Sequence, residues 1–111
     1  MVAFVFPGQG SQYVGMGQAL ADTFPICRQA FEEADDALGR NISQLCFDGP
    51  AEELQLTENT QPAILAMSVA VCRLLSFRGY EAQYMAGHSL GEYSAHVSAG
   101  TIGFADALRL V

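Results

Sequence analysis

The chain of 111 residues has room for one domain, and half of its residues are hydrophobic, which is enough to form a core. Twelve acidic side chains against five arginines give a net charge of −7, which argues against nucleic acid or an anionic membrane surface as a partner. The first residues form a short apolar run without a basic segment, and no uninterrupted apolar run approaches the length of about 18 that crosses a bilayer. We therefore expect neither a signal peptide nor a membrane span.

The cysteine pattern indicates a reducing compartment. Cys27, Cys46 and Cys72 are odd in number and form no C-x-x-C pair. We expect them to be buried as small apolar side chains, without disulfides and without a metal site. Together with the acidic composition, this pattern favours a cytoplasmic location.

The hydrophobic pattern predicts two strands with helices between and after them. Residues 2–6 are apolar and β-prone and should form a strand buried on both faces, and residues 84–86 should end a second buried strand. Helices are predicted from apolar spacing, from prolines at helix starts and from glycines at helix ends. They span residues 16–23, 25–38, 41–47, 50–54, 62–78, 92–99 and 104–111. Residues 57–60 should form a polar turn before the longest helix.

This order of elements favours an α/β fold with a parallel sheet and flanking helices. Both strands are apolar enough to need neighbours on each side, and two strands seldom form a stable sheet. We therefore expect residues 1–111 to be the first part of a larger domain.

One motif, Gly87-His88-Ser89-Leu90-Gly91, stands between the second predicted strand and the helix after it. Strand, Gly-x-Ser-x-Gly and helix in this order are typical of a nucleophile elbow. A side chain at Gly87 or Gly91 would clash, and Ser89 would be strained, with its hydroxyl exposed above the sheet. Free N–H groups at the helix start would face an oxyanion forming on Ser89. The alternative that the same letters allow is a glycine-rich turn with a solvated serine.

A second glycine-rich stretch, Gly8-Gln9-Gly10-Ser11-Gln12, follows the first predicted strand, and alone it indicates only a tight turn. The two stretches resemble the malonyl-CoA:acyl carrier protein transacylases of fatty acid synthesis and the related acyltransferase domains of polyketide synthases. Residues 49–54 and 60–63 match this family in the same order and spacing. The resemblance covers the N-terminal part of the family's domain. It implies that residues 1–111 are an N-terminal segment of the family's large, α/β-hydrolase-like subdomain, incomplete in this chain.

The resemblance implies that Ser89 is the catalytic nucleophile, which takes a malonyl group from coenzyme A as an ester and passes it to the phosphopantetheine thiol of acyl carrier protein. It implies an oxyanion hole made by the backbone N–H groups of Gln9 and Leu90. Leu90 resembles the residue of malonyl-selecting members. Gln61 matches a residue that lines the family's pocket, although a polar residue at a helix start is an equally plain interpretation. No bound cofactor and no metal are implied.

The sequence offers no general base for Ser89. His88 precedes the nucleophile, so its side chain should leave in another direction and pack beneath the turn. His96 lies seven residues on, about two helical turns or roughly 10 Å along the axis, too far for a hydrogen bond to Ser89. In the family, the catalytic histidine and the arginine that pairs with the malonate carboxylate come after residue 111, so Arg109 does not take that role.

The sequence is therefore compatible with three functions. The first is malonyl transfer by a longer protein. Met1 lies just ahead of the first predicted strand, which favours a stand-alone enzyme over a module of a synthase. The second is an α/β-hydrolase-type esterase or thioesterase that uses water as acceptor, which residues 8–12 disfavour because they are not of the HGGG type. The third is a non-catalytic fragment that binds a partner or self-associates through unpaired strands. We expect the 111-residue chain alone to be inactive, and poorly stable or self-associated.

Overall fold

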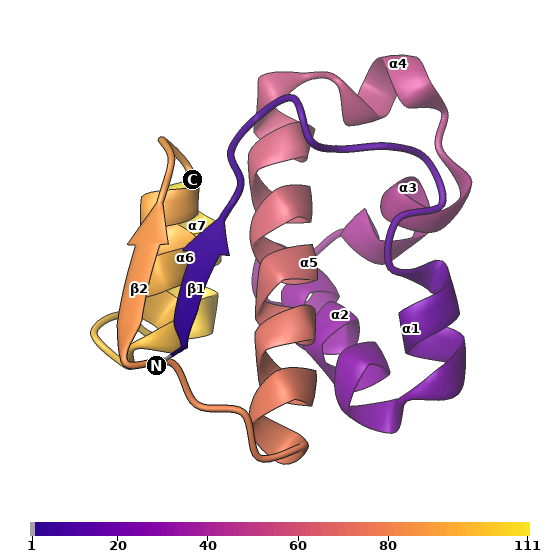
Figure 1. The fold of residues 1–111 in the computed structure, drawn as a ribbon. Coiled ribbons are helices and arrows are strands. Elements are labelled where there is room, and N and C mark those ends of the chain that lie inside the picture. Colours follow the sequence, from indigo (N-terminus) through magenta and orange to yellow (C-terminus); the bar gives the residue numbers. More distant parts are fainter. Residues whose placement is uncertain (1) are drawn as a thin grey trace.

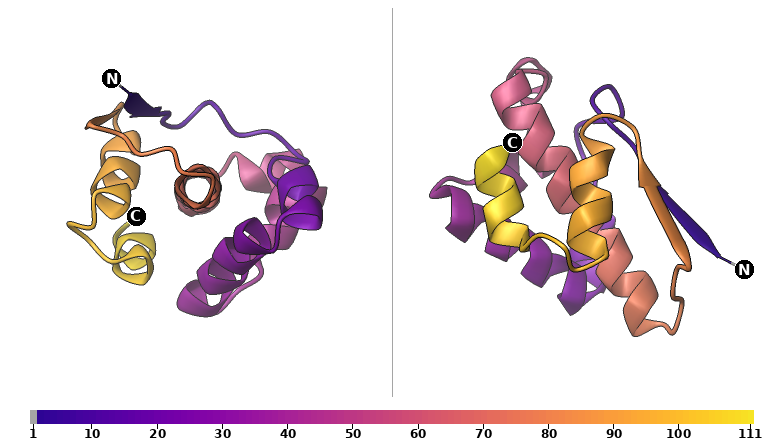
Figure 2. Two further views of the ribbon diagram at one scale, coloured as in Figure 1. Left: turned by 60° about the horizontal axis from the view of Figure 1, so that its bottom comes forward. Right: turned by 90° about the vertical axis from the view of Figure 1, so that its left-hand side faces the viewer.

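A computed structural model describes residues 2–111, which form an α/β fold with a two-stranded parallel sheet (Figure 1). The elements in chain order are β1 (Ala3–Phe6), α1 (Gln18–Thr23), α2 (Pro25–Leu38), α3 (Ile42–Asp48), α4 (Ala51–Leu54), α5 (Thr57–Phe77), β2 (Tyr84–Gly87), α6 (Gly91–Ser98) and α7 (Phe104–Leu110). Figure 2 shows α5 end-on in the middle of the molecule, with α6 and α7 on one side of it and α1 to α3 on the other. The prediction of an α/β fold with a parallel sheet and flanking helices is confirmed.

Helix α2 begins and ends at the residues that the sequence predicts. Pro25 begins the helix, and Gly39 ends it in the left-handed conformation, with φ 66° and its N–H donating to the Asp35 carbonyl at 2.9 Å. The buried face of α2 carries Cys27, Ala30, Phe31 and Ala34, and it packs against α5. The hydrophobic core therefore lies between α2 and α5, away from the sheet.

The start of α5 differs from the prediction. The helix begins at Thr57, so residues 57–60 form its first turn and not a polar turn before it. Pro62 lies inside the helix and has no N–H for the Glu58 carbonyl. Arg40 supplies the missing donor, because its Nη2 lies 2.8 Å from that carbonyl. A side chain 18 residues upstream therefore satisfies the first turn, and no local pattern could show this.

The length and composition of α5 also pass the test for a membrane span. It is the one helix within residues 2–111 that does so, and 56% of its apolar window is buried inside the fold. A core helix of a soluble protein passes the same test, so the finding is weak evidence for a span. The expectation of no membrane span rested on uninterrupted apolar runs, and it stays a prediction.

The two strands pair in parallel, with Ala3 opposite Tyr84 and Phe6 opposite Gly87. Helix α6 packs against both strands. The expectation that both strands are buried is wrong for residues 2–111, since Val5 in β1 is 77% exposed and Tyr84 in β2 is 62% exposed. The reason is that α6 packs on one face of the two strands, and no helix within residues 2–111 covers the face of Val5.

All three cysteines are buried and free, as predicted. Burial raises the pKa of the Cys27 thiol. Burial also raises the pKa of the Cys46 thiol from 9.0 to about 12, and the nearby Asp35 carboxylate adds to the increase. The interior therefore favours the neutral thiol at both positions.

This pKa shift predicts a loss of stability at high pH. Above pH 9 the Cys46 thiol ionises in the unfolded chain but stays neutral in the folded chain until about pH 12. The unfolded state then binds fewer protons, so the free energy of unfolding falls as pH rises from 9 to 12, by up to about 4 kcal/mol. Urea denaturation of the unsubstituted chain and of the Cys46→Ala variant, each measured at several pH values, isolates this effect. We expect the unfolding free energy of the unsubstituted chain minus that of Cys46→Ala to be constant below pH 9 and to fall above it. A constant difference up to pH 12 would contradict the raised pKa of Cys46.

Candidate active site

The predicted nucleophile elbow, residues 87–91, connects β2 directly to α6. Ser89 has φ 56°, and it is the non-glycine residue in the described chain that adopts a positive φ. This conformation is unfavourable for a residue with a Cβ and is typical of functional turns. Its side chain is exposed. The predicted strain and exposure of Ser89 are therefore found in the structure.

Both glycines of the elbow are required by close backbone contacts. A Cβ at Gly87 would lie 1.9 Å from the carbonyl carbon and oxygen of Gly91. A Cβ at Gly91 would lie 2.2 Å from the Phe6 carbonyl oxygen at the end of β1. No L side chain fits at such distances, so the elbow needs glycine at both positions, as the sequence predicts.

The glycine loop, residues 8–12, lies against this elbow. The strand pairing continues one residue beyond β2, because the His88 N–H donates to the Phe6 carbonyl at 3.2 Å. Gly8 lies two residues after Phe6, and a Cβ there would lie 2.5 Å from the His88 carbonyl oxygen. The two loops that carry Gln9 and Leu90 therefore leave the sheet at the same edge and touch.

The backbone N–H groups of Gln9 and Leu90 have no hydrogen-bond acceptor within residues 2–111. Leu90 is buried and stands at the N-terminal end of α6, whose unpaired N–H groups carry partial positive charge. An oxyanion on Ser89 is the kind of group that two such donors stabilise.

Gln61 lies in α5, four residues after Thr57, so the two side chains share one face of the helix. The Thr57 hydroxyl contacts the glycine loop, because it accepts a hydrogen bond from the Gln9 side-chain amide at 3.3 Å. This face of α5 is therefore directed toward the glycine loop, with Gln61 half-buried one turn further along. No local pattern marks Thr57 as part of the site, since residues 57–60 are predicted as a turn.

The two histidines do not supply a base in the described part of the chain, because neither hydrogen-bonds to the Ser89 hydroxyl there. His88 is exposed and does not pack beneath the turn, which corrects the expectation. His88 follows the last residue of β2, and its Nδ1 lies 3.6 Å from the position that a Cβ on Gly8 would take, so the imidazole lies beside the glycine loop. His96 is also exposed, near the C-terminal end of α6.

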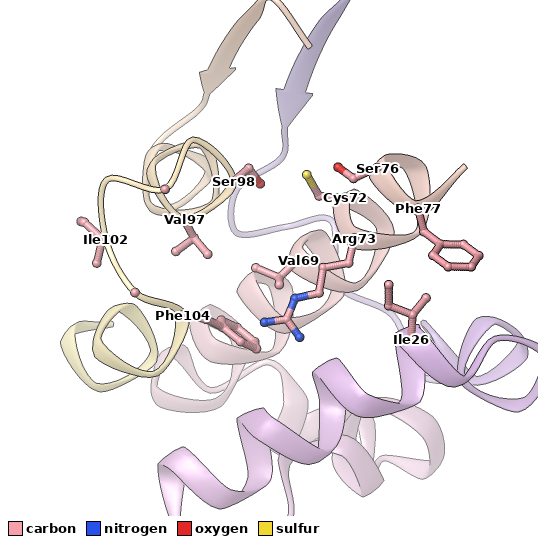
Figure 3. A pocket seen from close by; sticks show the side chains of 12 residues that line it. Ile26, Val69, Cys72, Arg73, Ser76, Phe77, Val97, Ser98, Ile102 and Phe104 are labelled. Atoms are coloured by element: carbon pink, nitrogen blue, oxygen red, sulfur yellow. The ribbon is translucent and has the colours of Figure 1, made fainter. Parts of the chain in front are cut away.

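A cavity of about 640 Å³ lies elsewhere, between α2, α5, α6 and α7 (Figure 3). Arg73 reaches into it, but its guanidinium is already used: it bonds the Glu33 carboxylate at 3.1 Å and lies 5.3 Å from the centroid of the Phe104 ring. The lining includes no residue of the glycine loop or the elbow. The cavity is thus separate from Ser89.

Comparison with known proteins gives one consistent family. Residues 3–111 match the family described as "Acyl transferase domain". The malonyl CoA-acyl carrier protein transacylase of Escherichia coli (strain K12) is 57% identical over 110 residues, which are 98% of this chain and 36% of that protein. The chain thus spans about a third of the length of such relatives.

Solved structures agree. The crystal structure of an acyl carrier protein S-malonyltransferase from Vibrio cholerae O1 biovar eltor superimposes with a TM-score of 0.95 at 51% identity, covering 98% of this chain and 36% of that one. A malonyl-transacylase in complex with its type II polyketide synthase acyl-carrier protein gives a TM-score of 0.93 at 54% identity, covering 97% and 35%. The chain therefore belongs to the acyl transferase domain family.

Proposed function

We propose that this chain supplies the nucleophile and the oxyanion hole of a malonyl-CoA:acyl carrier protein transacylase. The observation that carries the proposal is the contact between two loops. Ser89, at φ 56°, lies where the glycine loop touches the elbow backbone. The backbone N–H groups of Gln9 and Leu90 have no acceptor there within residues 2–111. This arrangement fits acyl transfer through a tetrahedral oxyanion.

The proposed reaction has two halves. The Ser89 Oγ attacks the thioester carbonyl of malonyl-CoA, its proton passes to a base, and the carbon–sulfur bond breaks to release coenzyme A as its thiol. The phosphopantetheine thiol of acyl carrier protein then attacks the malonyl ester, and Ser89 regains its proton. The Gln9 and Leu90 N–H groups would stabilise the oxyanion in both halves. Gln61 would line the pocket.

We assign residues 1–111 to the N-terminal segment of a large, α/β-hydrolase-like subdomain. The relatives' greater length and the exposed strand face at Val5 support this assignment. The base for Ser89 would come from the part of such relatives that this chain does not span. Carrier protein and coenzyme A thioester are the proposed partners, without a bound cofactor and without nucleic acid or membrane. The proposed location is the cytoplasm.

The test uses an E. coli chimera, in which this chain replaces the matching 110 residues of the E. coli relative. The purified chimera is mixed with malonyl-CoA, with and without phosphopantetheinylated carrier protein, and the malonylated carrier is measured by mass spectrometry. We expect carrier-dependent transfer and a malonyl ester on Ser89, both absent in Ser89→Ala. Rapid hydrolysis that does not depend on the carrier would instead identify the esterase or thioesterase alternative.

We also expect the 111-residue chain alone to self-associate, because both sheet edges are open and apolar strand residues are exposed within residues 2–111. Sedimentation velocity should show oligomers, and Val5→Lys should reduce them. Val14→Lys, at a partly exposed position outside the strands, is the matched control and should leave them unchanged. A monomer with a sharp thermal transition would contradict this expectation.

A further inference from the structure

The glycine loop, residues 8–12, is held on two sides. On the elbow side, Gly8 touches the His88 carbonyl so closely that a Cβ would lie 2.5 Å from its oxygen. The φ of Gly8 lies outside the left-handed region, so the close approach alone requires glycine there. This contact fixes how near the loop can come to the elbow, but it does not stop the loop from moving away.

Few hydrogen bonds oppose such a movement. Within the loop, the Ser11 hydroxyl donates to the Gly8 carbonyl at 2.8 Å, and the Gly10 N–H donates to the Gln12 side chain at 2.7 Å. These bonds are local and shape the turn. In the described part of the chain, the hydrogen bond from Gln9 Nε2 to Thr57 Oγ1 is the one that ties residues 8–12 to another element.

Thr57 is a fixed point because the first turn of α5 is anchored from outside the helix. The Arg40 guanidinium donates to the Glu58 carbonyl at 2.8 Å and also bonds the Asn59 side-chain oxygen. The Asn59 amide donates to the Glu53 carbonyl at 2.8 Å, and Asn59 is buried. Thr60 is fully buried, with its hydroxyl bonded to carbonyls of the preceding turn. A polar network that is satisfied in this way is rigid.

We propose that Thr57 is a positioning residue, whose hydroxyl holds the Gln9 loop against the elbow so that the Gln9 N–H faces the oxyanion on Ser89. The inference rests on the proposed function, since it assigns Gln9 the role of an oxyanion donor. Oxyanion stabilisation depends on donors that are in place before charge develops, and small displacements of such groups are costly. Thr57 itself touches no reacting atom.

The test compares Thr57→Val and Thr57→Ser in the E. coli chimera. Valine keeps the branched shape of threonine but cannot accept the hydrogen bond, whereas serine keeps the hydroxyl. We expect Thr57→Val to lower kcat for malonyl transfer about fivefold to tenfold with KM unchanged, and Thr57→Ser to stay within about twofold of the parent. A Thr57→Val enzyme with the kcat of the parent, or a Thr57→Ser enzyme as impaired as Thr57→Val, would overturn the proposal.

A second measurement does not depend on activity. Crystal structures of the chimera and its two variants give the distance between the Gln9 and Leu90 backbone nitrogens. We expect this distance to increase, or the loop to lose order, in Thr57→Val alone. An unchanged loop in Thr57→Val would refute the positioning role. Absence of transfer by the parent chimera would count against the proposed function, while these structures would still decide the role of Thr57.

Discussion

Replacing Gly87 with alanine is expected to lower kcat/KM of the E. coli chimera by about a hundredfold or more. The new Cβ would lie 1.9 Å from the Gly91 carbonyl group and 2.3 Å from the Glu92 nitrogen. These are backbone atoms in the first turn of α6, so no side-chain rotation relieves the clash. The elbow must open, which moves both Ser89 and the Leu90 N–H. Steady-state kinetics with malonyl-CoA and carrier protein measures the loss.

Gly103→Ala is the matched control for this substitution. Its φ is −67°, and a Cβ there meets only the Asp106 carboxylate, at an ordinary 3.5 Å. We expect it to leave kcat/KM unchanged and to alter the unfolding free energy by less than about 1 kcal/mol. Wild-type kinetics in Gly87→Ala, or an equal loss in Gly103→Ala, would contradict the steric argument.

The second large effect is the difference between the 111-residue chain and the chimera. We expect the chain alone to transfer malonyl about a thousandfold more slowly, because a positioned base contributes about 10² to 10⁴ to such reactions. The sequence contains only two histidines, and neither bonds to Ser89 within residues 2–111. Ser89→Ala should therefore change the residual rate of the chain little. Transfer by the purified chain that disappears in Ser89→Ala would show that the chain assembles a base of its own.

Local chemistry made most of the fold predictable. Pro25 and Gly39 mark the ends of α2 through their own backbone preferences, and the apolar spacing between them gives the buried face. The start of α5 was not predictable in this way. Proline favours the first turn of a helix, but here the helix begins more than a turn earlier, and the distant Arg40 guanidinium supplies the donor that Pro62 lacks.

In the candidate site, too, the local features were predictable and the contacts between distant elements were not. The elbow is a local motif, so its two glycines and the strained Ser89 followed from five consecutive residues. The roles of Gly8 and Thr57 depend on contacts between elements that are far apart in sequence, and the residues themselves carry no mark of those contacts. The exposure of His88 was likewise not predictable, because it depends on how the elbow and the glycine loop lie against each other.

The parallel pairing of β1 and β2 has a consequence for how the protein is made. Gln9 and Leu90 are 81 residues apart in sequence, and a parallel pair cannot form until the entire crossover between its strands exists. At ribosomal rates of about 5 to 20 residues per second, Leu90 is synthesised roughly 4 to 16 s after Gln9. Helices α1 to α5 all precede β2 in the chain and pack against one another, so they can fold during this delay, whereas the first strand has no partner. The nascent chain thus exposes an unpaired apolar strand until β2 is synthesised.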